Sequence, residues 1–336
     1  MTAPEPAAWT LPALGWNAFF AEQCGLEDVG LLPARIATVH RARMSAIGQE
    51  GPIRLALPVH TDTGAYTVGD WVLVEPGTHA IGRLLERRTV LARRVEGSKT
   101  PQLAGANIDT LFIVTSCNAD FNVARLERYL ALANESGAEP VIILTKADLT
   151  DAAKTYRAQA AALQRELAVV VVNPKETGAT AVLAPWCGEG RTVALVGSSG
   201  VGKSTLVNAL AGLEPEEAQE TGGIRARDDK GRHTTTSRSL HAIAGGGWVI
   251  DTPGMRTLHV SDAASGLETL FAEITELTHL CRFRDCTHEH EPGCAVQAAV
   301  ASGAVDPARL ARWRKLDAEN KARTPEAARG PKSRRR

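Results

Sequence analysis

Residues 197–205 read GSSGVGKST and give the strongest indication of the fold. They are Gly197, Ser198, Ser199, Gly200, Val201, Gly202, Lys203, Ser204 and Thr205. It satisfies the pattern G-x-x-x-x-G-K-[ST], between an apolar run at 192–196 that is typical of a buried strand and a helical pattern from residue 203. In that context the backbone N–H groups face a β-phosphate, Lys203 reaches the β- and γ-phosphates, and Ser204 binds Mg²⁺. We therefore expect a nucleoside triphosphate to bind at this turn.

The chain around this turn alternates apolar strands with amphipathic helices. Strand-like runs lie at 109–116, 140–145, 168–172, 191–197, 238–244 and 247–251, and helical patterns lie at 122–137 and 151–167. Continuous apolar runs in such an alternation are typical of a parallel sheet with helices on both faces, here of about six strands. The pattern predicts an α/β P-loop domain over residues 101–260.

A second motif, Asp251-Thr252-Pro253-Gly254, follows the last of these strands. Asp251 can hold Mg²⁺ through a water molecule, and the amide of Gly254 can face the γ-phosphate, as in the D-x-x-G switch of GTPases. The same four residues also form an ordinary turn. Their position about 50 residues after the phosphate loop favours the switch.

A third motif, Thr145-Lys146-Ala147-Asp148, resembles the guanine-reading pattern N-K-x-D. The carboxylate of Asp148 would accept two hydrogen bonds from guanine, whereas adenine would repel it. Thr145 replaces the asparagine whose amide ties the base loop to the phosphate loop, so only a hydroxyl is available and we expect modest affinity. An alternative is that Asp148 only caps a helix. A further base-contacting loop is expected near residues 172–175.

The order of these motifs is informative, because the guanine motif precedes the phosphate loop, whereas in an ordinary GTPase it comes last. We therefore predict a circularly permuted GTPase domain. Its switch at 251–254 leads directly into the C-terminal region, so a movement that depends on the γ-phosphate would be transmitted there.

The first switch is expected at residues 230–236, where Thr234 or Thr235 would complete the coordination of Mg²⁺. Met255 follows Gly254 where Ras-like enzymes keep a glutamine that orients water. His233 is the nearby candidate for the catalytic residue, although it could equally bind RNA or stay solvated.

A metal site is predicted near the C-terminus. Three of the six cysteines form the pattern Cys281-x4-Cys286-x-His288-x5-Cys294, which supplies a Cys₃His set suited to a closed, structural Zn²⁺ site. The nearby His290 and His279 are competing candidates for the histidine ligand.

The remaining segments are predicted from composition and periodicity. Short β-rich runs between residues 34 and 100 predict a small five-stranded barrel, either an RNA-binding OB-fold or a purely structural barrel. Residues 1–33 form an extension with no recognisable chemistry, 261–322 the helical metal-binding domain, and 323–336 a basic tail.

Composition and charge restrict the function. Apolar residues make 44% of the chain and charged residues 23%, as in globular proteins, and no apolar run spans a bilayer or resembles a signal peptide, so we expect a cytoplasmic protein. The 38 basic and 38 acidic residues cancel, but residues 34–100 and 305–336 are net basic. Two basic regions suggest a polyanionic partner, although a basic tail is often only a solubility device.

Together these residues resemble the circularly permuted RsgA (YjeQ) GTPases, which act in maturation of the small ribosomal subunit. The resemblance covers residues 34–322 and includes VGDWV at 68–72, the segment at 107–130, TKAD, GSSGVGKST, GRHTTT at 231–236, DTPG and the cysteine cluster. It implies an OB-fold, a permuted GTPase domain and a zinc domain, with hydrolysis stimulated by the small subunit. It also favours His288 as a zinc ligand and His233 as the catalytic histidine.

The resulting hypothesis is a monomeric enzyme that converts GTP and water to GDP and phosphate, grips rRNA of the small (30S) subunit, and leaves that subunit after hydrolysis. Two alternatives remain at this point. One is an RNA-binding assembly factor regulated by nucleotide, with negligible hydrolysis, and the other is a P-loop NTPase with no ribosomal role.

Overall fold

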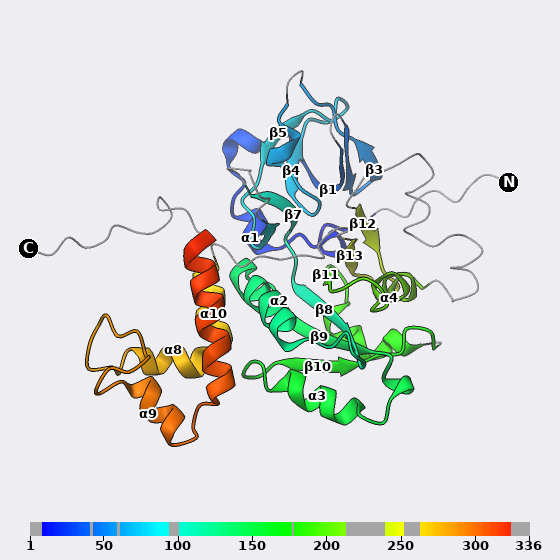
Figure 1. Cartoon of the computed structure of the whole chain (residues 1–336). Helices are drawn as coiled ribbons and strands as arrows, with labels where there is room; N and C mark the ends of the chain where they lie inside the picture. Colours follow the sequence, from blue (N-terminus) through cyan, green and yellow to red (C-terminus); the bar gives the residue numbers. More distant parts are fainter. Residues whose placement is uncertain are drawn as a thin grey trace, which may run out of the picture.

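The computed structural model describes residues 9–40, 43–58, 61–93, 101–176, 178–212, 239–251 and 263–323. Figure 1 shows a β-rich unit made from the N-terminal part of the chain, a central α/β unit, and a helical C-terminal unit beside it. Predicted site residues 234, 235 and 254, the candidate catalytic residue His233, and residues 324–336 of the basic tail lie outside the described residues.

Among the described residues, the α/β unit contributes six neighbouring strands to an eleven-stranded sheet, in the order β10-β9-β8-β11-β13-β12. Their bounds are β8 Thr110–Ser116, β9 Glu139–Thr145, β10 Ala168–Val171, β11 Thr192–Val196, β12 Ser239–Ala242 and β13 Trp248–Asp251. The expected number of strands is confirmed, but the expectation of a wholly parallel sheet is wrong, because β12 runs antiparallel to β13. Only a short turn joins these two strands, and a parallel connection needs a crossover of a dozen residues or more.

Helices cover both faces of this sheet, as the apolar runs predict. Leu111 and Ile113 of β8 belong to one buried cluster, whereas Phe112 and Val114 belong to another. The flanking helices are α2 (Val123–Ser136), α3 (Ala153–Ala161) and α4 (Lys203–Leu210), with the short turns η4 (Ala147–Leu149) and η5 (Ala179–Trp186). Alternating side chains of a strand point to opposite faces, so both faces are buried.

The β-rich unit contains β1 (Leu32–His40), β2 (Arg43–Gly48), β3 (Gly51–Arg54), β4 (Trp71–Val74) and β5 (Ile81–Leu84), with η3 (Thr63–Ala65) before β4. The strands pair antiparallel in the order β3-β2-β1-β4-β5, and a parallel bridge between Ala56 and Ala80 joins the two ends. This unit has its own core, which includes Ile36, Met44 and Val72. A hairpin of β6 (Val90–Arg93) and β7 (Gln102–Ala106) follows it.

The two β units are joined directly. Thr38 of β1 pairs with Ser239 of β12, so β1 continues the central sheet into the β-rich unit. The short elements η1 (Pro12–Leu14), α1 (Ala18–Ala21) and η2 (Leu26–Asp28) precede β1 and lie near this junction in Figure 1.

The C-terminal unit consists of α7 (Ala264–Leu270), α8 (Ala272–Thr278), α9 (Ala295–Ala301) and α10 (Pro307–Arg323). Helix α7 packs closely on α2, since a Cβ placed on Gly266 would lie only 2.1 Å from the carbonyl oxygen of Ala131. Within the described ranges no helix is both long and apolar enough to cross a membrane.

Candidate nucleotide site and metal cluster

The phosphate loop connects β11 to α4 and requires glycine for its shape. Gly197, Gly200 and Gly202 all have positive φ, at 141°, 79° and 96°. A Cβ on Gly197 would lie 2.2 Å from the carbonyl oxygen of Val114 in the neighbouring strand β8. The loop therefore packs its backbone against the sheet edge, which only glycine permits.

Polar groups of the loop face inward. The Nζ of Lys203 donates to the carbonyl oxygen of Gly197 at 2.8 Å and to that of Ser198. The hydroxyl of Ser198 is buried and has no hydrogen-bond partner among the described residues. Ser204 is exposed in the first turn of α4. An ammonium group and a buried hydroxyl inside a turn at a helix N-terminus suit a phosphate oxygen.

The predicted base loop contacts the phosphate loop at two points. The hydroxyl of Thr145, at the end of β9, donates to the carbonyl oxygen of Val201 at 2.7 Å. The Nζ of Lys146 donates to the carbonyl oxygen of Gly200 at 2.8 Å. The hydroxyl at position 145 therefore does tie the two loops together, and the lysine contact is a link that the sequence did not indicate. Asp148 is exposed in η4.

The expected loop at residues 172–175 also reaches this edge. A Cβ on Gly202 would lie 3.9 Å from Cγ of Pro174 and 3.8 Å from Cγ2 of Thr145. Asn173 organises the loop, because its amide donates to Glu176 at 2.8 Å. Three segments that are separate in the sequence thus converge at the carboxyl ends of β9, β10 and β11.

Asp251 lies on the side of the phosphate loop opposite the base loop, because β13 and β8 flank β11 on opposite sides. It is the last residue of β13, which pairs in parallel with β11 through Ala194 and Ile250, and it is buried. Of the predicted magnesium-site residues, the structure thus places Ser204 and Asp251 at the same sheet edge, while positions 234, 235 and 254 lie outside the described residues.

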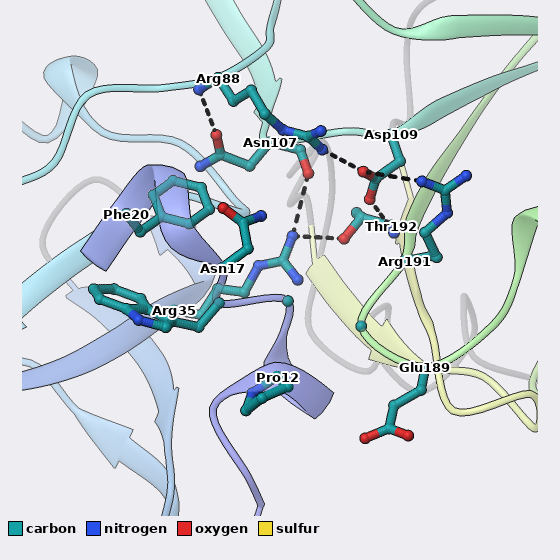
Figure 2. Close-up of a pocket in the computed structure, with 13 residues that line it drawn as sticks. Pro12, Asn17, Phe20, Arg35, Arg88, Asn107, Asp109, Glu189, Arg191 and Thr192 are labelled. Carbon is teal, nitrogen blue, oxygen red and sulfur yellow. Dashed lines mark hydrogen bonds and ion pairs between the residues drawn. The ribbon is translucent and has the colours of Figure 1, made fainter. Parts of the chain in front are cut away.

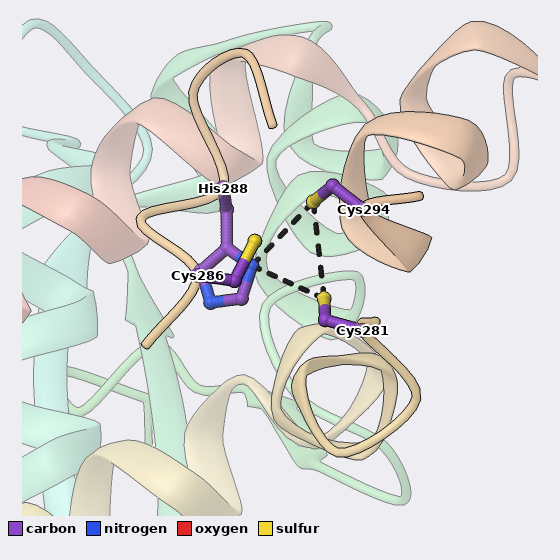
Figure 3. A group of neighbouring side chains, drawn as sticks. All are labelled: Cys281, Cys286, His288 and Cys294. Atoms are coloured by element: carbon purple, nitrogen blue, oxygen red, sulfur yellow. Dashed lines mark hydrogen bonds between the residues drawn. The ribbon is translucent and has the colours of Figure 1, made fainter. Parts of the chain in front are cut away.

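The cysteine cluster forms a compact set of donors in the C-terminal unit (Figure 3). The four ligand atoms of Cys281, Cys286, His288 and Cys294 lie within 4.8 Å of one another. The Nδ1 of His288 is 3.4 Å from Sγ of Cys281 and 3.6 Å from Sγ of Cys294, and these two sulfurs are 3.8 Å apart. Tetrahedral zinc bonds of about 2.0 to 2.3 Å require edges of about 3.6 to 3.8 Å, so the residues fit this metal. The side chain of His290 is 85% exposed, outside the set.

Neighbouring side chains orient the histidine and the turn that carries it. His288 has a φ of 61° and packs edge-on against Trp313, with ring centroids 5.7 Å apart. Burial lowers the pKa of His288, which favours the neutral imidazole that a metal requires. The carboxylate of Glu291 accepts hydrogen bonds from the hydroxyl and amide of Thr287, and these bonds hold the pKa of Glu291 well below its usual range. Sequence reasoning missed Glu291, although an acidic residue between ligands is a usable signal.

The base loop thus precedes the phosphate loop in the chain, yet both lie at the carboxyl ends of parallel strands of one sheet. This arrangement defines the class of circularly permuted P-loop GTPases. The family model described as RsgA GTPase matches residues 84–261, and the chain belongs to the RsgA GTPase family.

Individual relatives agree with this assignment. The chain is 65% identical, over 99% of its length and 96% of the relative, to the small ribosomal subunit biogenesis GTPase RsgA of Mesorhizobium japonicum. It is 41% identical to the protein of the same name from Streptomyces coelicolor, over 92% of its length and 86% of that relative. Among solved structures, YjeQ from Thermotoga maritima is similar with a TM-score of 0.63 and 24% identity, covering 87% of this chain and 99% of YjeQ. The circularly permuted GTPase YloQ is similar with a TM-score of 0.62 and 22% identity, over 90% of this chain and 99% of YloQ.

Proposed function

We propose that this GTPase binds the small ribosomal subunit, promotes its late maturation, and leaves the subunit when GTP is hydrolysed to GDP and phosphate. The proposal is supported by the names of its relatives and, in the structure, by one observation above the others. The hydroxyl of Thr145 bonds the base loop to the phosphate loop at 2.7 Å, which unites the two halves of a guanine nucleotide site across the permuted order.

In this proposal Asp148 reads the guanine base, the backbone of residues 197–202 and Lys203 bind the phosphates, and Ser204 and Asp251 hold Mg²⁺ with a threonine at 234 or 235. Bound Mg²⁺ neutralises charge that develops on the phosphoryl oxygens. His233 is the candidate for orienting the attacking water. Catalysis here consists of positioning and electrostatic stabilisation.

We further propose that the chain is divided into an extension at 1–33, an OB-fold at 34–100, the GTPase domain at 101–260, a zinc domain at 261–322 and a basic tail at 323–336. The strand order β3-β2-β1-β4-β5 and the parallel bridge that joins its ends support the OB-fold. The match between donor spacings and tetrahedral geometry supports one structural Zn²⁺ per chain.

The contact with rRNA is proposed to include the exposed loop between the first two cysteines. The guanidinium of Arg282 lies 5.5 Å from the ring centroid of Phe283, and Phe283 is 42% exposed. Arg284 beside them is also exposed. An aromatic ring flanked by arginines is suited to stack an unpaired base and pair with its phosphate. We also propose that the protein acts in the cytoplasm and as a monomer.

The decisive experiment is GTP turnover with purified small subunits, with large subunits as the control. A large increase with small subunits alone would support both the enzyme and its partner. Equal turnover by the protein alone, with small subunits and with large subunits would contradict the proposed dependence on the small subunit and favour a binding factor with negligible hydrolysis.

Nucleotide identity is tested separately with Asp148→Asn, which should shift preference from GTP toward xanthosine triphosphate. An unchanged preference would contradict the guanine-reading role of Asp148.

RNA contact is tested with Phe283→Ala, which should weaken binding to the small subunit while leaving GTP affinity unchanged. Leu280→Ala is the matched control, because Leu280 is an exposed apolar residue just before Cys281, outside that loop. Equal binding by the two variants would contradict the stacking role.

A further inference from the structure

The N-terminal segment at residues 9–17 lies between the two β units and contacts both. On the side of the β-rich unit, the amide of Trp9 donates to the carbonyl oxygen of Gln49 at 2.8 Å, and the ring of Trp16 meets Trp71 edge-on with centroids 4.9 Å apart. On the other side, the ring centroids of Trp9 and of Trp248 in β13 are 5.1 Å apart. The segment is therefore a packed part of the fold and bridges the β units.

Its contact with β13 is specific. The indole Nε1 of Trp248 donates to the carbonyl oxygen of Ala13 at 2.8 Å, and Trp248 is 2% exposed. Trp248 is the first residue of β13 and Asp251 is the last. Since a strand advances about 3.3 Å per residue, Trp248 lies about 10 Å along β13 from Asp251.

The same segment also contacts the beginning of β11, the strand that leads into the phosphate loop. Arg35 of β1, which is 1% exposed, donates through Nη1 to the carbonyl oxygen of Leu14 at 2.7 Å and through Nη2 to the hydroxyl of Thr192 at 2.6 Å. Figure 2 shows Arg35 between the N-terminal segment and Thr192. Gly190, just before β11, is so close that a Cβ there would lie 2.3 Å from the carbonyl oxygen of Pro12.

A pocket of about 260 Å³ lies beside these contacts, and Asn17, Arg35 and Asp109 are among the residues that line it (Figure 2). Beside this pocket the segment is held by close contacts to both β11 and β13. Since close-packed groups transmit displacement, removing one of these contacts should shift the strand.

We propose that residues 9–17 position β13 for the nucleotide reaction, with Trp9 and Trp248 as positioning residues that fix where Asp251 stands relative to the phosphate loop. This inference rests on the proposed role of Asp251 in holding Mg²⁺. It assigns a function to the segment for which the sequence indicated no chemistry.

The test measures the dissociation constant of a fluorescent GTP analogue in excess Mg²⁺ and in EDTA, for the full chain and its variants. Trp9→Ala removes the ring contact, and Trp248→Phe removes the indole hydrogen bond but keeps an aromatic ring. Loss of the aromatic pair in Trp9→Ala, or of the hydrogen bond in Trp248→Phe, should lower affinity in Mg²⁺ about twofold to tenfold, with affinity in EDTA unchanged. Phe19→Ala is the matched control, because Phe19 is in the same region but packs on Phe20 and is 37% exposed.

The variant Asp251→Asn distinguishes the proposed magnesium role of Asp251 from the positioning role of Trp9. If Asp251→Asn keeps the full benefit of Mg²⁺, the proposed magnesium role of Asp251 fails. If Asp251→Asn loses that benefit while Trp9→Ala keeps it, the positioning role is overturned, even where the melting temperature of Trp9→Ala has fallen. Because Trp9 is only partly buried, its variant gives an answer even if Trp248→Phe does not fold.

Discussion

Replacing Glu127 with alanine is expected to loosen the C-terminal unit from the GTPase domain. Glu127 lies on α2 with 0% exposure, and its Oε1 accepts hydrogen bonds from Nη1 of Arg309 and Nε of Arg312, both at 2.8 Å. Both arginines belong to α10, and Arg309 also donates to Glu273 at 2.8 Å. This buried carboxylate thus helps hold α10 against the nucleotide-binding domain, beside the ion pair of Arg128 with Glu319 at 2.8 Å.

The expected loss of stability in Glu127→Ala depends on the interactions that Arg309 and Arg312 retain. Removing one partner of a buried ion pair costs about 3 to 5 kcal/mol, because the remaining charge stays buried and unpaired. Arg309 keeps Glu273 and lies 4.1 Å from the ring centroid of Phe271, and Arg312 is 30% exposed and can turn toward water. We therefore expect the lower value, about 3 kcal/mol, for Glu127→Ala. Glu127→Gln keeps an acceptor oxygen and should lose less.

Hydrogen exchange measured on individual peptides reports the stability of α10 separately from that of the rest of the chain. A loss of about 3 kcal/mol should speed exchange of amides in α10 about 100-fold, with amides of β8 much less affected. The control is Glu276→Ala, which removes the exposed pair between Arg165 and Glu276 that joins the same two units. That pair is solvated, so exchange should stay near the wild-type rate. Equal exchange in the Glu127 and Glu276 variants would refute the reasoning.

Three shorter predictions concern single positions. Thr145→Ala removes the hydroxyl that donates to the phosphate loop, so GTP affinity should fall about fivefold, for about 1 kcal/mol, in a nucleotide titration, and Thr145→Asn should restore it. Gly197→Ala should abolish nucleotide binding in the same titration, because its Cβ would lie 2.2 Å from the carbonyl oxygen of Val114; retained binding would show that the loop shape does not require glycine. Burial raises the pKa of Cys187 to about 12, so its thiol should resist alkylation from pH 7 to 9 in the folded protein, whereas the exposed Cys24 should react, as peptide mapping would show; early labelling of Cys187 would contradict its burial.

Much of the candidate nucleotide site could be proposed from the sequence because its signals are local. Each of its three motifs is a few adjacent residues whose type and spacing indicate the chemistry: the phosphate loop, the D-x-x-G motif that begins at Asp251, and the guanine motif. The antiparallel direction of β12 was missed because an apolar run has no direction, and only the short turn to β13 sets it.

Residues 9–17 illustrate the opposite case. Their tryptophans are visible in the sequence, but nothing local shows that Trp9 faces Trp248 or that Ala13 accepts its hydrogen bond. The same holds for Glu127, which reads as one of many acidic residues on an amphipathic helix until α10 is seen to cover it.

The phosphate-loop chemistry, the permuted order of the motifs, the cluster of three cysteines with a nearby histidine and the family resemblance are all visible in the amino-acid sequence. Tertiary structure alone decided how these parts are connected. The hydroxyl of Thr145 reaches a carbonyl 56 positions away, Arg309 reaches Glu127 across 182 positions, and Trp248 reaches Ala13 across 235. Such contacts depend on which elements pack together, and packing follows from burial of the whole chain rather than from any local pattern.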